Sequence, residues 1–514
     1  MKRYFLGIDI GTFESRGILI DESFRVAADA SVPHGMDNPQ PGWFEQEAEA
    51  VWWGDLCKLC RTLIKQSEIR PEQIACVGTS ALGTDCLPVD EQCRPLRPAI
   101  LYGIDARASE EAAWLTEHYG QARVQELFGH PICSGDTATK ILWLRRHEPE
   151  IYAKTAYFLT GSSFLTARLT GKYVIDQSLA KGSFRPLYQA DGSVNEAECG
   201  LYCRPDQIAA CAWSTDIVGT VTPEAAAQTG LAAGTPVITG TGDSTAEAIS
   251  VGLVEPGTAF FQYGSSMFYY YCTDHFVGSY VSPQGNGALK GGKAFTVPGT
   301  YCLGDGTNAA GTLTRWVRDL LYSKELDAEK QGGENAYAVM AREAAAVPPG
   351  SDGLIMLPYI YGERSPLQDA EATGMLFGLK GTHGRAQINR AALEAVGYST
   401  YQHLLLFEEL GVPPRRIITA GGGTKNAAWM QIICDMAGMP LTIPEPFQCS
   451  SYGDAMLAAL GVGALESFAA LRAALPQGRI LQPDRKNHEF YQEHYPIFRD
   501  LYLENRDRMH KMQK

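Results

Sequence analysis

The first part of the chain alternates short apolar runs with amphipathic ones. Residues 4–21 read "YFLGIDIGTFESRGILID", and this pattern predicts a strand, a tight turn and a second strand. Apolar residues recur at helical spacing over 46–65, and a strand-like run, "IACVGTSA", follows at 74–81. Two more helical patterns occupy 106–120 and 138–150. Strands and helices therefore alternate, which predicts an α/β fold with mixed sheets.

The second half repeats this arrangement in outline. An apolar run at 236–238 gives way to "TGTGD" and then to a helical pattern, "STAEAISVG". The stretch "GTAFFQYGSSMFYYYC" again predicts strand, glycine turn and strand, with "YGSS" where the first copy has "DIGT". A strand, a triple glycine and a helix follow at 415–438, and 487–510 predicts a closing helix. We expect two related α/β domains, 1–245 and 246–514, whose hairpin turns face a shared cleft.

Length and charge limit the classes of partner. A chain of 514 residues is longer than one hydrophobic core usually serves, which agrees with two domains. The formal net charge is −14, whereas nucleic acid and anionic membranes bind to basic faces, so we expect neither as a partner. A phosphorylated ligand stays possible, because backbone amides in glycine loops bind phosphate without a basic surface.

The cysteines and the start of the chain predict a cytoplasmic protein. The 13 cysteines are scattered, and we expect mostly buried thiols in a reducing compartment. The pair Cys57 and Cys60 lies inside a helical pattern, and no second pair completes a metal site. The opening "MKRYFLGID" reaches Asp9 before a secretory apolar core can form, and no run approaches the roughly 20 apolar residues of a membrane helix.

Three glycine turns follow predicted strands: "DIGT" at 9–12, "YGSS" at 263–266 and "AGGGTKN" at 420–426. Small residues there let backbone amides approach a polyphosphate. The chain lacks GxxxxGK[ST], which excludes a Walker-type NTPase, and it lacks GxGxxG in a dinucleotide-binding unit. Asp243 lies at the predicted junction between a strand and the helix that follows it. From the residues alone it is either a helix cap or a group that accepts a proton from a substrate.

Two longer motifs bring in a resemblance. "GDTATKILWLRRH" at 135–147, with Lys140 and Trp143 in register, and "GMLFGLKGTHGRAQINRAALE" at 374–394 resemble the two signatures of the FGGY family of carbohydrate kinases. "LPYIYGERSP" at 357–366 resembles the "GER" loop of that family. The resemblance runs from about Phe5 to about Gly463. It implies two actin-like (ribonuclease H-like) domains with mixed sheets flanked by helices and a cleft between them.

The same resemblance implies roles for individual residues. Asp243 resembles the catalytic base that takes the proton of the sugar hydroxyl. Asp9 resembles the acid that orients Mg²⁺ through water. ATP-binding positions are implied at Gly11, Thr12, Arg16, Gly264, Ser265, Gly311, Gly422, Gly423 and Asn426. The expected donor is Mg-ATP, since phosphoryl transfer needs mainly positioning and charge cancellation on the phosphates.

The sugar is less well defined. Two segments of this chain, "GTSALG" at 78–83 and "LYGIDARA" at 101–108, match positions where typical xylulose kinases carry motifs similar to "GQMHG" and "WNDGR". Ser80, Ala81 and Leu82 thus replace an amide and an imidazole, whereas Asp105 is kept. We expect sugar contacts from Ser80, Ala81, Asp105 and Asp243. Because a site built on hydroxyl contacts is sensitive to such changes, xylulose is the leading guess among ketopentoses, polyols and related sugars.

Two alternatives from other classes remain at this stage. A non-catalytic member of the actin-like group needs no base, yet Asp9 and Asp243 are both present. A chaperone-like ATPase would carry a peptide-binding domain after the ATPase pattern, and none follows. The expected assembly is a homodimer that binds a sugar and ATP.

Overall fold

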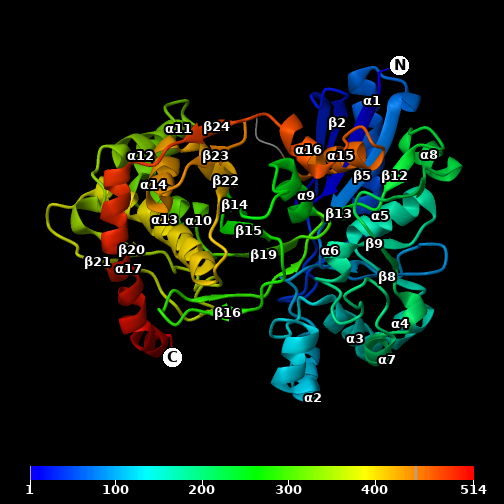
Figure 1. Cartoon of the computed structure of the whole chain (residues 1–514), viewed down its shortest axis with the longest axis horizontal. Coiled ribbons are helices and arrows are strands. Elements are labelled where there is room, and N and C mark those ends of the chain that lie inside the picture. The colour runs from blue at the N-terminus through cyan, green and yellow to red at the C-terminus, as the bar shows by residue number, and fades with distance from the viewer. Residues whose placement is uncertain (1, 446–448, 514) are drawn as a thin grey trace.

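Two seven-stranded sheets organise the computed structural model, which describes residues 2–445 and 449–513. Figure 1 shows the sheets in separate halves of the molecule, the first to the right and the second to the left. The first sheet has the order β11-β12-β5-β1-β2-β3, and β13 pairs with β5. Its strands are β1 (Tyr4–Ile10), β2 (Glu14–Asp21), β3 (Val26–Pro33), β5 (Ile74–Ala81), β11 (Ile217–Thr220), β12 (Pro236–Ile238) and β13 (Thr241–Gly242).

The second sheet has the order β18-β19-β15-β14-β22-β23-β24. Its strands are β14 (Thr258–Tyr263), β15 (Met267–Thr273), β18 (Lys293–Ala294), β19 (Tyr301–Gly306), β22 (Arg416–Ala420), β23 (Leu441–Ile443) and β24 (Arg479–Leu481). In both sheets one central strand has an antiparallel hairpin partner and a parallel neighbour: β1 lies between β2 and β5, and β14 lies between β15 and β22. The sequence echo is thus a real repeat of topology, and the α/β fold with mixed sheets is confirmed.

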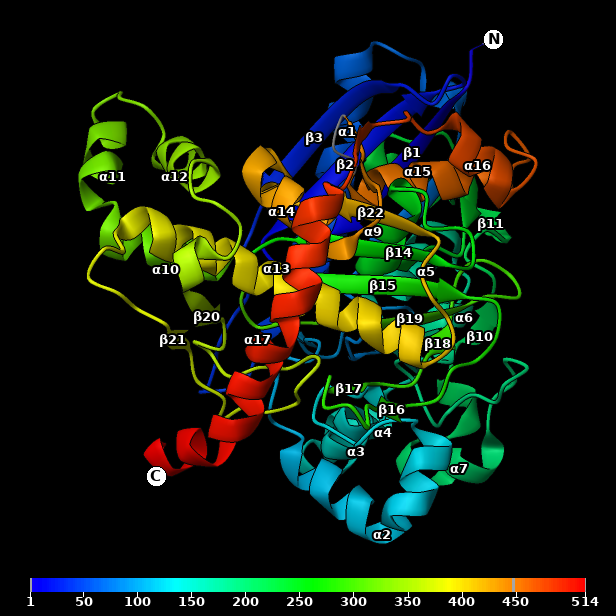
Figure 2. The ribbon, with the colours of Figure 1, turned by 60° about the vertical axis from the view of Figure 1, so that its left-hand side comes forward.

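Helices cover both sheets. Those of the first half are α1 (Gly54–Ser67), α2 (Ser109–Leu127), α3 (Thr137–His147), α4 (Pro149–Lys154), α5 (Gly161–Thr170), α6 (Gln177–Ala180), α7 (Glu196–Tyr202), α8 (Pro223–Thr229) and α9 (Asp243–Ser250). Those later in the chain are α10 (Gly311–Leu321), α11 (Ser323–Lys330), α12 (Ala336–Ala345), α13 (Arg385–Glu409), α14 (Ala427–Ala437), α15 (Ser450–Gly461), α16 (Phe468–Ala474) and α17 (Arg485–Met512). Figure 2 shows α13 crossing behind α17 in the second half of the fold. Most residues of α13 are buried, and they lie on nearly all sides of the helix.

One late helix returns to the first half of the fold. α15 packs on β1, β5 and α9, and Figure 1 shows α15 and α16 beside the blue strands. Glycines allow this approach, since a Cβ at Gly7 would lie 1.8 Å from the carbonyl oxygen of Ser451 and one at Gly78 would lie 2.4 Å from that of Asp454. The last strand of the first sheet ends at residue 242 and the first strand of the second sheet begins at 258, whereas α15, late in the chain, packs on the first sheet. The domain limits 1–245 and 246–514 therefore stay a prediction.

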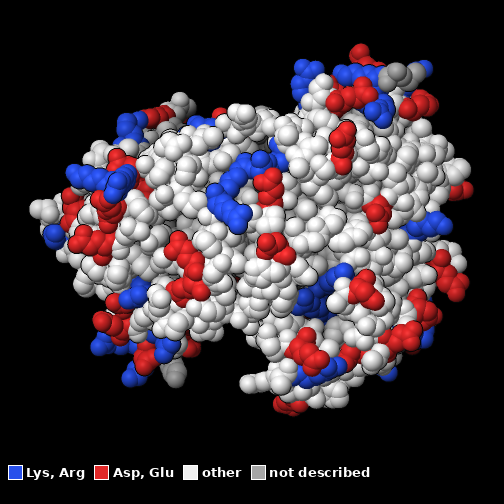
Figure 3. Space-filling view, in the orientation of Figure 1, with Lys and Arg blue, Asp and Glu red and all other residues white. Residues whose placement is uncertain are grey.

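Charge is spread over the surface. On the face in Figure 3, acidic and basic side chains are interspersed and form no continuous basic stripe. None of the helices among the described residues is long and apolar enough to span a bilayer.

Candidate active site

Strand register brings the two candidate acids to one sheet edge. Asp9 on β1 pairs with Ser80 on β5, and Ser80 in turn pairs with Thr241 on β13. Asp243 follows two residues after Thr241 as the first residue of α9. Parallel strands end at the same edge, so residues far apart in the chain become neighbours there. Asp243 is among the charges that act on Asp9.

Asp243 is not the N-cap of its helix. Gly242 holds that position, and the Asp243 carboxylate accepts a hydrogen bond from the Ser244 amide at 2.6 Å. Burial raises the pKa of Asp243, and the Ser244 hydrogen bonds and the Lys293 ammonium oppose the shift. The capping interpretation is therefore wrong, and a carboxylate with raised basicity is left at the helix start.

Asp9 is held by a neighbouring hydroxyl. Ser80 Oγ lies 2.8 Å from Asp9 Oδ1. Burial, followed by the charge of Asp243, raises the pKa of Asp9 to about 7. Arg16 lies opposite Asp9 across the β1–β2 hairpin, and its buried Nε has no hydrogen-bond partner in residues 2–445 and 449–513. A buried guanidinium nitrogen without a partner is a ready donor for an anionic ligand.

The first glycine turn joins β1 to β2. The amide of Gly11 donates to the carbonyl of Glu14 at 3.1 Å, which closes the turn. The hydroxyl of Thr12 lies 3.3 Å from that of Tyr102, and its carbonyl accepts from Gln46. The turn thus lies at the edge that carries Asp9.

Three distant segments of the second half line one cavity of about 540 Å³. The three segments are the turn after β14, the start of α10 and the glycine-rich turn after β22, and residues of α12 and α13 complete the lining. Six predicted nucleotide positions line it, namely Gly264, Ser265, Gly311, Gly422, Gly423 and Asn426. Tyr263, Tyr337 and Trp429 are among the other lining residues, and they give it an aromatic wall.

Close backbone contacts shape this cavity. The amide of Gly311 donates to the carbonyl of Gly264 at 3.0 Å, and a Cβ at Gly311 would lie 2.5 Å from that oxygen. Only glycine fits there without moving one of the two segments. Gly422 has no atom within 4 Å of its would-be Cβ, so it faces open space. Asn426 caps α14 through the Trp429 amide at 3.0 Å.

The structure gives the predicted sugar contacts Ser80, Ala81 and Asp105 different surroundings. Ser80 reaches Asp9 and Asp454 with its hydroxyl. Ala81 is buried at the end of β5. Both carboxyl oxygens of Asp105 accept from Arg107, at 2.8 to 3.0 Å, and one also accepts from the Phe44 amide. Asp105 is thus engaged in a buried ion pair.

Sequence reasoning missed several charged groups beside the two acids. Asp454 on α15 lies 2.7 Å from Ser80 Oγ, and Glu247 lies one turn after Asp243, where burial raises its pKa to about 7. Lys293 on β18 is half-buried and interacts with Asp243 across the two halves. Their positions come from tertiary contacts, and no local pattern marks them.

Asp85 is a further acid that sequence reasoning missed. Neither carboxyl oxygen of Asp85 makes a well-formed hydrogen bond with the described residues, although the side chain is fully buried. Burial raises the pKa of Asp85, whereas the Lys140 ammonium opposes the shift. Lys140 is fully buried too, and it donates to the carbonyls of Thr84 at 2.6 Å and Gly135 at 3.0 Å. Lys140 of the first signature is therefore a buried partner of Asp85.

Comparison with known proteins decides the family. Residues 4–250 match the N-terminal domain of the FGGY family of carbohydrate kinases, and residues 263–462 match its C-terminal domain. The chain belongs to this family. It is thus a sugar kinase, and the resemblance seen in the sequence is confirmed.

Relatives of this kinase cover almost the whole chain. The xylulose kinase of Escherichia coli is 29% identical over 97% of this chain and 98% of its own length. The gluconokinase of Bacillus subtilis is 28% identical, over 98% and 96%. The crystal structure of xylulose kinase from Rhodospirillum rubrum superposes with a TM-score of 0.88 at 28% identity, covering 99% of this chain and 100% of that one. The two-domain actin-like fold is therefore shown.

The described side chains include no group of three or more His, Cys, Asp and Glu residues placed to hold a metal ion. Asp9 offers a carboxylate near Asp243 at the edge that carries the first glycine turn. Mg²⁺ in kinases is usually held by one or two carboxylates together with substrate phosphates and waters, and Asp9 fits that requirement.

Proposed function

We propose that the protein transfers the terminal phosphoryl group of ATP to a hydroxyl of a small neutral sugar, a xylulose-like ketose or a polyol, with Asp243 as the general base. The observation that carries the proposal is the shared sheet edge of Asp9 and Asp243. The same edge meets the second half of the fold, since Gln262 donates to Glu247 at 2.9 Å just before the Gly264 turn. This hydrogen bond links the helix that begins with Asp243 to the strand that leads into the Gly264 turn.

Asp243 suits the role of base for two reasons. It is held by the Ser244 amide, which fixes the carboxylate. Its basicity is raised by burial, and a general base works best when its pKa approaches the working pH. The proton of the sugar hydroxyl passes to this carboxylate while the oxygen attacks phosphorus, and the bond from phosphorus to the bridging oxygen of ATP breaks to release ADP.

The residues around the phosphates supply donors and small backbones. We assign Arg16 and the turns at Gly11, Thr12, Gly264 and Ser265 to the phosphates. The adenosine side is assigned to Gly311, Gly422, Gly423 and Asn426, which line the cavity of the second half. Mg²⁺, when bound beside Asp9, would neutralise charge on the phosphates.

The charges near the base favour a neutral substrate. Five acids interact electrostatically around this edge, namely Asp9, Asp85, Asp243, Glu247 and Asp454. Three cations oppose them, namely Arg16, Lys140 and Lys293. A sugar acid would add a further carboxylate to this cluster of acids, whereas carboxylates accept hydrogen bonds from the hydroxyls of a neutral sugar. This supports a ketose or polyol over gluconate.

Sugar-dependent ATP consumption tests the proposal. The purified protein is assayed with Mg-ATP and, in turn, xylulose, xylitol, glycerol and gluconate. We expect one neutral compound to raise ATP consumption at least about 10-fold over the sugar-free rate. Gluconate as the best substrate would contradict the argument from charge. Consumption unchanged by any sugar would favour the non-catalytic or chaperone-like alternative.

We also expect a homodimer located in the cytoplasm. Analytical sedimentation of the purified protein tests the dimer.

A further inference from the structure

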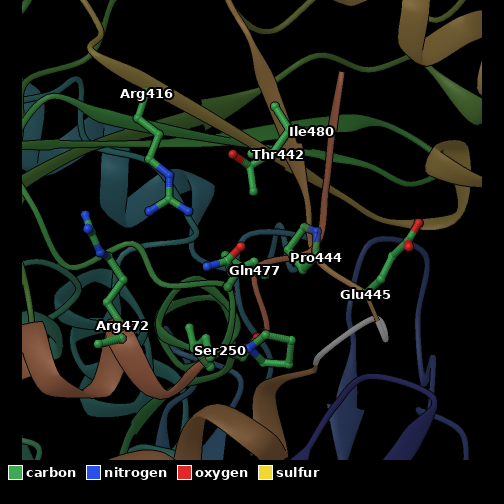
Figure 4. Close-up of a pocket in the computed structure, with 12 residues that line it drawn as sticks. Ser250, Arg416, Thr442, Pro444, Glu445, Arg472, Gln477 and Ile480 are labelled. Carbon is green, nitrogen blue, oxygen red and sulfur yellow. The ribbon is translucent and has the colours of Figure 1, made fainter. Parts of the chain in front are cut away.

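A second cavity, of about 440 Å³, lies at the far end of α9 from Asp243. It is lined by both halves of the fold: Ser250 at the end of α9, Arg416 on β22, Thr442 on β23, Arg472 on α16 and Gln477 after it. Figure 4 shows the guanidinium groups of Arg416 and Arg472 pointing into the same space, with the amide of Gln477 beside them. The residues assigned to ATP and sugar contribute nothing to this wall.

The positive charge in this cavity is only partly balanced. Arg472 pairs with Glu255, and Glu445 pairs with Arg479 at 3.2 Å. The Arg416 guanidinium makes no hydrogen bond or ion pair with the described part of the chain. Burial and the nearby Arg472 lower the pKa of Arg416, whereas Glu255 opposes the shift. In Figure 4 the Glu445 carboxylate points away from both arginines. The two guanidinium groups thus share one carboxylate, that of Glu255.

Uncharged polar groups complete the wall. The Thr442 hydroxyl and the Gln477 amide have no side-chain hydrogen bond within residues 2–445 and 449–513. Ser250 donates to the carbonyl of Glu247 at 2.7 Å, so its oxygen remains free to accept. Two guanidinium groups beside neutral donors suit a phosphate group, which guanidinium binds with two parallel hydrogen bonds. Acceptors close by suit the hydroxyls of a small phosphorylated compound.

We propose that this cavity is a regulatory site for a phosphorylated small metabolite, held by Arg416 and Arg472. A ligand there contacts β22 of the second sheet, and α16, which follows the helix covering the first. It also meets the end of α9, whose eight residues span about 12 Å and begin with Asp243. Since the bound anion touches both halves, it favours one arrangement of the halves according to its affinity for each. Its effect on turnover rests on the proposed function, whereas the binding itself does not.

The binding test uses inorganic phosphate as the probe and calorimetry or ³¹P NMR as the readout. Arg416→Gln and Arg472→Gln each remove one guanidinium from the cavity. Arg415→Gln is the matched control, because Arg415 is exposed, adjacent in sequence and outside the cavity. We expect either cavity variant to weaken this phosphate site about 10-fold or more, and the control to bind as the unmodified protein does.

Phosphate binding that is unchanged in both cavity variants would overturn the proposal. An equal loss in Arg415→Gln would overturn it too, because the effect would then be general electrostatics. Circular dichroism checks each fold, and Gln477→Leu serves if an arginine variant unfolds. A second readout is sugar-dependent ATP turnover with phosphate added, which should change in the unmodified protein but not in Arg416→Gln. Binding without any effect on turnover would overturn the link to α9, whereas an absence of turnover would reject only the proposed function.

Discussion

Asp454 Oδ2 lies 2.7 Å from Ser80 Oγ, although 374 positions separate the two residues in the chain. The same hydroxyl lies 2.8 Å from Asp9 Oδ1. A hydroxyl has one hydrogen, so it can donate to only one of the two carboxyl groups. The other must carry a proton and donate to Ser80. Burial raises the pKa of Asp454 well above its usual range, and Asp9 and Asp243 raise it further, which makes Asp454 the protonated partner.

This geometry predicts opposite outcomes for two substitutions of Asp454. Asp454→Asn offers an amide N–H in place of the carboxyl O–H, so the hydrogen bond to Ser80 is kept and Tm should move by only about 1–2 °C. Asp454→Ala removes the donor and leaves a cavity in a tightly packed helix, and Tm should fall by several degrees. Thermal unfolding of both variants measures the difference. If the asparagine variant melts as early as the alanine one, Asp454 is an anion and the assignment is wrong.

The second prediction concerns the base. In Asp243→Asn the Oδ1 oxygen still accepts from the Ser244 amide, and Gly242 remains the N-cap, so stability should hardly change. The variant lacks the proton acceptor, which is typically worth about 10²–10⁴-fold in rate. Turnover with the best sugar should therefore fall at least about 100-fold, with little change in ATP affinity. Ser244→Ala is the control. Near-normal turnover in the asparagine variant would exclude Asp243 as the base.

Two glycines of the nucleotide cavity should respond differently to alanine. A Cβ at Gly311 meets the Gly264 carbonyl, so Gly311→Ala should lower both Tm and ATP affinity. A Cβ at Gly422 meets no protein atom, so Gly422→Ala should keep the Tm of the unmodified protein. Its ATP affinity should fall only if the bound nucleotide lies against Gly422. Calorimetric titration with ATP and thermal unfolding separate the two effects. Normal ATP binding by both variants would place the nucleotide elsewhere.

The Asp85 carboxyl should help to exclude sugar acids. Asp85→Asn removes an ionisable carboxyl group beside Asp243, and we expect KM for the neutral sugar to rise about 10-fold, since a carboxyl group that can accept a sugar hydroxyl is replaced by an amide. Discrimination against gluconate should weaken in the same variant. Asp90→Asn, at a surface turn where Asp90 pairs with Arg94, is the matched control. Unchanged kinetics on every substrate would make Asp85 a structural partner of Lys140 alone.

Asp176 should make stability fall as the pH rises. Burial raises its pKa to about 6, against hydrogen bonds from Ser178 and from Thr241 at 2.9 Å. The folded chain then keeps the proton longer than the unfolded chain does, so stability is lost between pH 3.8 and about 6. The rise in pKa corresponds to about 3 kcal/mol in all. Asp176→Asn should therefore gain Tm relative to the unmodified protein as the pH rises from 5 to 7.5. A pH-independent difference in Tm would contradict this.

Local elements were predictable from the sequence, because period and turn chemistry act over a few residues. The strands over 4–21 and 257–273, the run at 236–238 and the C-terminal helix all appear close to their expected places. Asp243 could be singled out because it follows a predicted strand, and Asp9 because of the family resemblance. Asp454, Glu247 and Lys293 could not be singled out from the sequence, because their positions beside Asp243 depend on tertiary structure. Asp454 is placed there by α15, Glu247 by one turn of helix, and Lys293 by the contact between the two sheets. The ion pair of Asp105 with Arg107 likewise depends on side-chain directions that spacing does not specify.

The return of α15 to the first sheet also sets an order of events during synthesis on the ribosome. Strands β1 and β5 are complete by residue 81, whereas the helix that covers them ends at Gly461. At about 5–20 residues per second, the glycine-lined face of the first sheet waits some tens of seconds for its cover. The nascent N-terminal half therefore exposes apolar surface for most of translation. A chaperone that shields nascent chains would act in that interval, and truncation before residue 450 would leave the surface permanently open.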